Sequence, residues 1–218
     1  DPRIVAKARR IERISYEEML EMASLGAKVL QTRSVELAMN HNVPVRVLSS
    51  FLPPDAPNPG TLVCSEDEIL EKQVVSGVAY SRDEAKVTLF GVADRPGVSA
   101  RIFSLLAAKG VNVDMIVQAN ARGENQANMV FTCTDRDSQI AQEALSANQK
   151  DIEFERLEVN RDVAKVSIVG SGIQNAPGYA SRMFGTLADA ASPVGNPNLI
   201  YTGGQNNGAS SGILKSTD

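Results

Sequence analysis

The stretch from Ala85 to Gln118 constrains the fold more than any other part of the chain, because its hydrophobic pattern changes repeatedly. Val87 and Leu89 alternate with more polar residues, which predicts a half-buried strand. The loop Asp94-Arg95-Pro96-Gly97 then ends the strand, since proline fixes φ and glycine permits a sharp turn. Apolar residues next recur at helical spacing, and alternation resumes before Gln118. The stretch therefore predicts strand, loop, amphipathic helix and strand.

The loop and the start of the helix carry groups that can bind a free amino acid. The N–H groups of a helix N-terminus near Gly97 can accept a carboxylate, helped by the helix dipole. Asp94 is close enough in sequence to pair with an ammonium group through a charge-assisted hydrogen bond. Asp-x-Pro-Gly is also an ordinary turn, so the pattern alone leaves both a ligand site and a simple turn open.

The residues that follow complete a small module. Residues 129 to 133 alternate, which predicts a strand with one buried face. Ser138 is expected to cap a second helix that carries Ile140, Ala144 and Leu145, and residues 152 to 155 predict a last strand. The order βαββαβ predicts an α+β module in which four strands are backed by two helices on one face.

The N-terminal part of the chain predicts two helices and a strand. Ser15 followed by Glu18 is a capping box that opens the first helix, and Gly26 can close it. Residues 45 to 48 predict a buried strand. The segment from 52 to 60 contains four prolines, which predicts a loop or a domain boundary. The core contacts expected from the second helix are Val29, Val35, Leu37 and Ala38.

A second, partial copy of the module follows the first. Residues 163 to 169 predict a strand, Gly170-Ser171-Gly172 a loop and residues 180 to 190 a helix, and a separate strand is expected from Val74 to Tyr80. The Gly-x-Gly is weak evidence for a nucleotide site, because no acidic residue follows at the required spacing. Residues 192 to 218 are rich in Gly, Asn and Ser, which predicts a flexible tail and an end foreign to the module.

Six stretches of the chain together form a specific pattern: Ile14-Ser15-Tyr16-Glu17-Glu18-Met19, Gly26-Ala27-Lys28-Val29-Leu30, Val74-Val75-Ser76-Gly77-Val78-Ala79, the Asp94 to Gly97 loop, Val111 to Gln118 and Val166 to Gly172. On these motifs the chain resembles the aspartate kinase family over roughly residues 1 to 190. The resemblance implies tandem ACT domains with the ferredoxin-like βαββαβ fold, preceded by the last helices and strand of an α/β amino-acid kinase domain. The implied divisions are 1–62 for the end of the kinase domain and its linker, 84–160 for the first ACT domain, 70–83 with 161–191 for a second, incomplete ACT domain, and 192–218 for an atypical tail.

The resemblance also implies a regulatory function. Aspartate kinases transfer a phosphoryl group from ATP to L-aspartate, giving 4-phospho-L-aspartate, and their ACT domains sense lysine or threonine for feedback control. The effector would lie where two ACT modules meet, with Asp94 binding its ammonium group and the backbone of Gly97, Val98 and Ser99 its carboxylate. The residues that would complete the pocket are Asn112, Val113, Asp114 and Gln118.

Catalysis by the chain itself is not expected. The Gly-rich phosphate loop and the Lys-Phe-Gly-Gly segment of the family are missing, and phosphoryl transfer depends on such positioning groups. Arg3 is expected to be a remnant of the nucleotide site, and ATP and magnesium belong to the parent enzyme. Two alternatives remain: a separate, non-catalytic sensor subunit that pairs with a longer kinase chain, and a phosphotransferase competent by itself.

Composition excludes other classes of function. The net charge of −4 gives no reason to expect nucleic-acid binding, and no apolar run is long enough to span a membrane. Cys64 and Cys133 have no partners at metal-binding spacing, so both are expected to be reduced thiols in a cytoplasmic protein. ACT pairing favours a homodimer or a complex with a kinase chain, whereas the choice between lysine and threonine stays open.

Overall fold

The computed structural model describes residues 5–53, 55, 57, 59–69, 74–121, 125–173, 176–191, 199–203 and 210–212. The chain divides into two compact units. The second unit runs from Ser81 to Lys165, and the first contains the described residues up to Tyr80 together with those from Val166 to Ala191. Strands β4 (Gly77–Ala93) and β7 (Arg156–Val169) carry the chain from one unit to the other.

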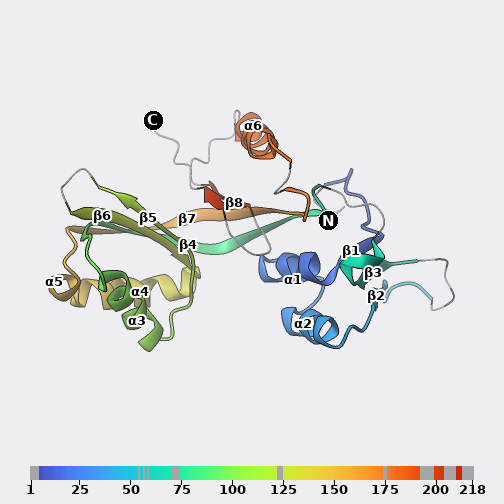
Figure 1. Cartoon of the computed structure of the whole chain (residues 1–218), viewed down its shortest axis with the longest axis horizontal. Coiled ribbons are helices and arrows are strands. Elements are labelled where there is room, and N and C mark those ends of the chain that lie inside the picture. Colours follow the sequence, from blue (N-terminus) through green and yellow to red (C-terminus); the bar gives the residue numbers. More distant parts are fainter. Residues whose placement is uncertain are drawn as a thin grey trace. The chain divides into compact units, whose positions relative to one another are not determined.

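The second unit has the expected βαββαβ order. Its strands lie in the order β5-β6-β4-β7, and β6 is antiparallel to both β4 and β5. The helices all lie on one face of this sheet (Figure 1). The elements between β4 and β7 are α3 (Val98–Ala108), β5 (Val113–Asn120), β6 (Gln126–Cys133), α4 (Asp135–Ala147) and α5 (Gln149–Ile152).

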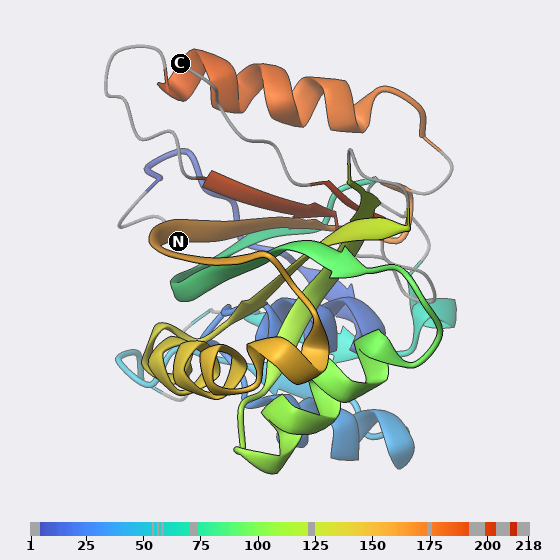
Figure 2. The same cartoon turned by 90° about the vertical axis from the view of Figure 1, so that its left-hand side faces the viewer.

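The hydrophobic core of the second unit fills the space between the sheet and its helices. Alternate residues of β4 and β6, such as Leu89 and Phe131, are fully buried, as the period of a half-buried strand requires. Ile102 and Leu106 of α3 and Leu145 of α4 meet them from the other side. The predicted amphipathic helix and its flanking strands are therefore confirmed, and Figure 2 shows the helices beneath the strands.

The sequence predicted two separate strands where the structure has the single strand β4. Residues 74 to 80 and 85 to 93 were expected as separate strands, but β4 is continuous from Gly77 to Ala93. Residues 163 to 169 belong to β7, which starts earlier than predicted, at Arg156, whereas the strand expected at residues 152 to 155 is not formed. The polar residues between the expected strands contain neither proline nor glycine, so nothing in the backbone ends the extended conformation.

The second helix of the module also begins earlier than predicted. Thr134, not Ser138, is its N-cap, and the Thr134 hydroxyl accepts a hydrogen bond from the Asp137 N–H at 3.2 Å. Ser138 is instead fully buried inside α4, whereas Ile140 is exposed. Ile152 belongs to α5 and not to a strand.

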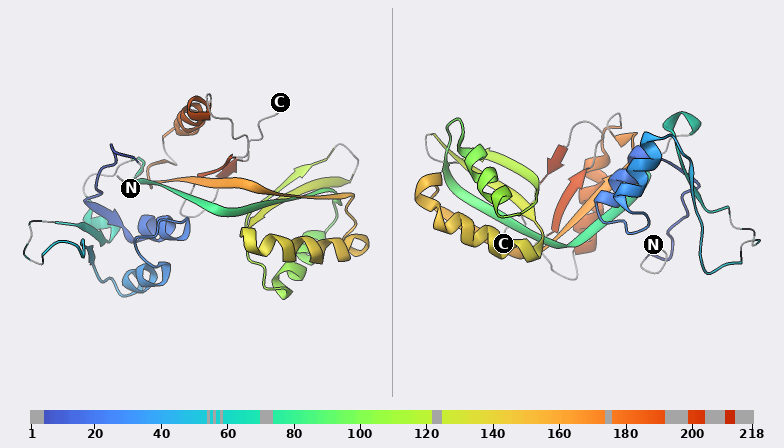
Figure 3. Two further views of the ribbon diagram at one scale, coloured as in Figure 1. Left: turned by 180° about the vertical axis from the view of Figure 1, so that it is seen from behind. Right: turned by 90° about the horizontal axis from the view of Figure 1, so that it is seen from below.

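The first unit contains the two N-terminal helices and a small sheet. The Ser15 hydroxyl accepts the Glu18 N–H at 3.2 Å, which confirms the predicted cap. Val35 and Ala38 are buried as expected, but Val29, Leu37 and Leu48 are exposed. Fewer apolar residues of this region therefore belong to the core than predicted. The three strands have the order β1-β3-β2, and Figure 3 shows the helices beside them. These elements are β1 (Arg13–Ser15), α1 (Tyr16–Ser24), α2 (Thr32–Asn40), β2 (Val45–Val47), β3 (Thr61–Cys64) and the short 3-10 helix η1 (Glu66–Glu68).

The C-terminal part contains one predicted helix and two strands that were not predicted. Helix α6 (Tyr179–Ala191) lies where residues 180 to 190 predicted it. Strands β8 (Leu199–Gly203) and β9 (Ser210–Gly212) pair antiparallel within the predicted flexible tail, whose other residues lie outside the described part. None of the helices in the described ranges has the length and apolar character needed to cross a membrane.

Candidate functional site

The loop between β4 and α3 presents the predicted binding groups at the surface. Gly97 is the N-cap of α3 and has a φ of 92°, the left-handed conformation that glycine adopts without strain. A side chain at this position would find no atom within 4 Å, so the loop faces open space. Val98 is buried and anchors the first turn of the helix. The Arg101 N–H donates to the Gly97 carbonyl at 3.1 Å, and the Val98 N–H makes a long bond of 3.4 Å to the Arg95 carbonyl. The first amides of an α-helix have no acceptor inside the helix, so amides at this position can bind a ligand.

Three predicted side chains meet beside this loop. The Gln118 side-chain amide donates to Asp94 Oδ1 at 3.1 Å, and the Ser99 hydroxyl donates to Gln118 Oε1 at 3.4 Å. Asp94 lies in the loop after β4, Ser99 in α3 and Gln118 in β5, and we call the three the Asp94–Ser99–Gln118 cluster. The cluster therefore combines a carboxylate, an amide and a hydroxyl with the amides of a helix start.

Backbone contacts hold the loop in place on both sides. The Asp94 N–H donates to the Asn125 carbonyl at 2.8 Å, and the Ala93 N–H donates to the Glu153 carbonyl at 3.1 Å. Arg95 forms an ion pair with the Glu153 side chain. The Asp94 carboxylate is thus presented from a loop that is fixed to both neighbouring segments, which favours a preorganised site.

The remaining predicted residues lie at the start of β5 and do not join the cluster through any bond found in the described part of the chain. Asn112 is exposed, and Val113 packs against the core of the second unit. Asp114 is bound elsewhere, because its Oδ2 accepts a bond from Lys165 Nζ at 2.7 Å. Partial burial favours a higher pKa for Asp114, but the hydrogen bond and positive charge of Lys165 bring this pKa below its ordinary value of 3.8.

A bulge in β5 explains how Gln118 reaches the cluster. Asp114 lies opposite Thr132 of β6, whereas Gln118 lies opposite Met129. An advance of four residues along β5 therefore matches an advance of three residues along β6. The extra residue reverses the alternation of side chains beyond the bulge. Gln118 consequently shares the face of Met129, which belongs to the core beneath α3.

Sequence reasoning missed Lys165 and the conformation of Met115. Met115 has a φ of 45°, in the left-handed region that side chains other than glycine seldom adopt, and no pattern around it signals a bulge. Lys165 had a usable signal: it interrupts the apolar alternation of residues 163 to 169 at a position where a strand faces inward.

Arg3 is the one residue of the chain that was expected to belong to a nucleotide site. Arg3 lies outside the described residues. Within the described ranges, no group of three or more His, Cys, Asp or Glu side chains is placed to hold a metal ion. Cys64 and Cys133 are both buried free thiols, and burial, with the nearby acidic residue Asp137, raises the pKa of Cys133 to about 11.

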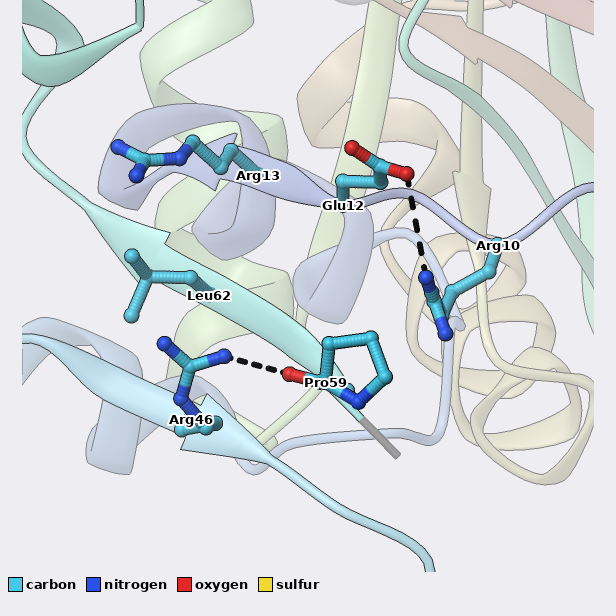
Figure 4. A pocket seen from close by; sticks show the side chains of 7 residues that line it. Arg10, Glu12, Arg13, Arg46, Pro59 and Leu62 are labelled. Atoms are coloured by element: carbon cyan, nitrogen blue, oxygen red, sulfur yellow. Dashed lines mark hydrogen bonds and ion pairs between the residues drawn. The ribbon is translucent and has the colours of Figure 1, made fainter. Parts of the chain in front are cut away.

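A separate cavity of about 210 Å³ lies in the first unit and contains none of the predicted site residues (Figure 4). Arg10 pairs with Glu12 at 3.9 Å, and Arg46 donates to the Pro59 carbonyl at 2.5 Å. The cavity is lined by three arginines and one glutamate, so its charge favours the binding of an anion. The residues that line it are Arg10, Glu12, Arg13, Arg46, Pro59, Gly60 and Leu62.

Two family models match the chain. The ACT domain model matches residues 86–150, which contain all the predicted effector residues, and the amino acid kinase family model matches residues 1–49. The first match falls on the second unit and contains its Asp94–Ser99–Gln118 cluster. The second match falls on the segment that contains α1 and α2.

Several aspartate kinases are similar to this chain. An aspartate kinase of Pseudomonas putida is 47% identical over 189 residues, which cover 86% of this chain and 45% of that protein. The chain thus spans a little less than half the length of this relative. The regulatory subunit of aspartate kinase from Thermus flavus is 37% identical, with a TM-score of 0.50 over 55% of this chain and 78% of the subunit. Escherichia coli aspartokinase III, solved with aspartate and ADP, is 28% identical, with a TM-score of 0.71 over 87% of this chain and 41% of that one.

Proposed function

The chain belongs to the aspartate kinase family, and we propose that it is the amino-acid-sensing, regulatory part of such an enzyme. The parent reaction would be the phosphorylation of L-aspartate by ATP to 4-phospho-L-aspartate. Lysine, threonine or both would be the effector and would control the first step of their own biosynthesis. Feedback of this kind needs only a modest coupling free energy, typically ~1–3 kcal/mol between effector site and active site.

The observation that carries this proposal is the Asp94–Ser99–Gln118 cluster at the start of α3. An α-amino acid has an ammonium and a carboxylate on adjacent carbons, and the cluster offers a carboxylate beside the amides at the start of α3. In the proposal, Asp94 accepts the ammonium and the amides of Gly97, Val98 and Ser99 bind the carboxylate. Gln118, whose side-chain amide donates to Asp94 at 3.1 Å, would turn this amide toward the bound molecule.

A second copy of the chain is the proposed partner. Strand β5 is the outer strand of the sheet in the second unit, and an outer strand can pair with a strand of another chain. Ile116, on this strand, is 49% exposed. Pairing of two β5 strands would cover the outer edge of the sheet and Ile116, and it would bring two copies of the cluster to one interface. The two buried free cysteines are compatible with work in the reducing cytoplasm.

The nucleotide and its metal would be bound by other parts of a kinase chain. ATP supplies the phosphoryl group, and magnesium neutralises its charge during transfer. Arg3 is the only residue of this chain that we propose for the nucleotide site. We assign no catalytic residue here, so regulation is the role that the described residues support best.

A separate, non-catalytic sensor subunit is the second candidate. The similarity to the regulatory subunit of Thermus flavus supports it, since 78% of that subunit is covered. The match of residues 1–49 to the amino acid kinase family favours the first candidate, because those residues belong to a catalytic fold. Co-purification with a longer kinase chain would favour the sensor subunit.

Isothermal titration calorimetry with L-lysine and L-threonine tests the proposed site. Asp94→Asn keeps the shape of the side chain and removes its charge, and Asp83→Asn makes the same change at an exposed position of β4. Hydrogen bonds to charged groups contribute ~1.5–3 kcal/mol, so we expect Asp94→Asn to weaken binding by roughly tenfold or more. Gln118→Ala should weaken binding less, and Asp83→Asn should not change it. Equal affinity in all four proteins would refute the site.

A further inference from the structure

Lys165 is a buried cation that joins three strands of the second unit. Its side chain is 7% exposed, and its Nζ lies 2.7 Å from Asp114 Oδ2 on β5 and 3.1 Å from Glu84 Oε1 on β4. Glu84 is also buried, with a side chain 10% exposed. A charge removed from water persists only when it is paired, so these contacts fix where the ammonium group lies.

Asp114 is held at three points at once. Besides Lys165, its Oδ1 accepts the N–H of the next residue, Met115, at 2.7 Å. Its backbone carbonyl accepts the hydroxyl of Thr132 at 3.1 Å, and Thr132 is fully buried. The Asp114 carboxylate therefore accepts the Met115 N–H in place of a backbone carbonyl of a neighbouring strand, at the point where β5 is irregular.

Met115 is the strained position of the bulge. Its φ of 45° costs free energy for a residue with a side chain, so neighbouring contacts must stabilise it. The Asp114 carboxylate supplies one of these contacts, and it can keep that orientation because Lys165 holds its other oxygen. Beyond this bulge, Gln118 shares the face of Met129 and meets Asp94 and Ser99.

We propose that Lys165 is a positioning residue for the effector site: by holding Asp114 it maintains the bulge at Met115 that turns Gln118 toward Asp94 and Ser99. The predicted effect of Lys165 on effector affinity rests on the proposed function. The predicted effect of Lys165 on the position of Gln118 does not. The role of Asp114 changes as well: it organises the site from behind and leaves the recognition of the ammonium group to Asp94.

The test uses the full chain and four variants. Lys165→Met removes the ammonium group but leaves Glu84 unpaired, so a double variant with Glu84→Gln removes both buried charges together. Lys165→Arg keeps a cation that can reach carboxylates. Lys109→Met is the matched control, since Lys109 is exposed at the end of α3.

The structural step is measured without any ligand, by nuclear Overhauser contacts from the Gln118 side-chain amide. We expect contacts to Ser99 in the unmodified chain, in Lys165→Arg and in Lys109→Met, and their loss in Lys165→Met and in the double variant. Retention of these contacts in a folded double variant would overturn the inference, whether or not the chain binds an amino acid.

The consequence for binding is measured by calorimetry with L-lysine and with L-threonine. We expect the double variant to bind the effector at least fivefold more weakly and Lys165→Arg to recover most of the affinity. An unmodified chain that binds neither amino acid would refute the proposed function, while the contacts of Gln118 would still decide the role of Lys165. Native affinity in the double variant would overturn the inference and leave the proposed function standing.

Discussion

At the scale of single residues, the contact between Lys165 and Asp114 makes the stability of the second unit depend on pH. Burial disfavours the charged form of Lys165, but its bond to Asp114 and the charges of Glu84 and Asp114 raise its pKa above 10.5. The pKa of Asp114 is lowered from 3.8 by the same contact, despite partial burial. Asp114 thus contributes stability above pH 3.8 that is lost as the pH falls through its lower folded-state pKa. Lys165 contributes stability below pH 10.5 that is lost as the pH rises through its higher folded-state pKa.

We therefore predict a loss of stability on acidification that depends on Lys165. Urea unfolding between about pH 7 and about pH 3 should show a smaller fall in unfolding free energy in the Glu84→Gln/Lys165→Met double variant than in the unmodified chain. Lys109→Met, at an exposed site, should follow the unmodified chain. An equal fall in unfolding free energy in all three proteins would show that the contact between Lys165 and Asp114 does not contribute to the acid dependence.

At the scale of elements, the bulge in β5 depends on the backbone of Met115 and not on its side chain. Glycine adopts a positive φ without strain, whereas valine at a φ of 45° is a severe outlier. Met115→Gly should therefore keep effector binding near that of the unmodified chain, and Met115→Val should weaken it severalfold. Calorimetry with both variants checks this prediction, and tight binding by Met115→Val would contradict it.

The start of α4 gives an independent test at the same scale. The Thr134 hydroxyl caps the helix by accepting the Asp137 N–H. Loss of such a cap typically costs ~1 kcal/mol, so Thr134→Ala should lower the unfolding free energy by about that amount. Ser146→Ala changes an exposed residue near the other end of the same helix and should be nearly neutral. Equal effects of the two substitutions in urea unfolding would show that the cap contributes little.

Much of the element order was predictable, because periodicity and turn residues act locally. The loop from Asp94 to Gly97, the helix after it and the cap at Ser15 all follow from neighbours in sequence. The single strand β4 was not predicted, since polar residues look like a break although they do not end an extended backbone. The bulge at Met115 was not predictable from pattern, because Asp114 is held by Lys165, which lies 51 residues further along the chain.

The candidate site was predictable to a similar extent. Family resemblance identified Asp94, Ser99 and Gln118, and hydrogen bonds bring these three together. It also grouped Asp114 with them, although Asp114 is bound by Lys165. Sequence indicates which side chains suit a ligand, but the face on which each one lies depends on strand register.

At the scale of the whole molecule, the proposed pairing of two β5 strands predicts a dimer. Light scattering should give twice the chain mass of 23.3 kDa. Ile116→Lys places a charge on the outer strand and should yield a monomer, whereas Ile140→Lys, at a residue 42% exposed on α4, should leave the dimer intact. A monomeric unmodified chain, or a dimer unaffected by Ile116→Lys, would contradict this interface.

The effector site is tested most directly by ¹H–¹⁵N spectra recorded while L-lysine or L-threonine is added to the full chain. Binding at the Asp94–Ser99–Gln118 cluster predicts that the largest shifts occur at the amides of Gly97, Val98 and Ser99 and at the Gln118 side chain, and that they saturate. Asp94→Asn should abolish these shifts at the same ligand concentration. Saturating shifts confined to other residues, or spectra unchanged by both amino acids, would contradict the proposed effector site.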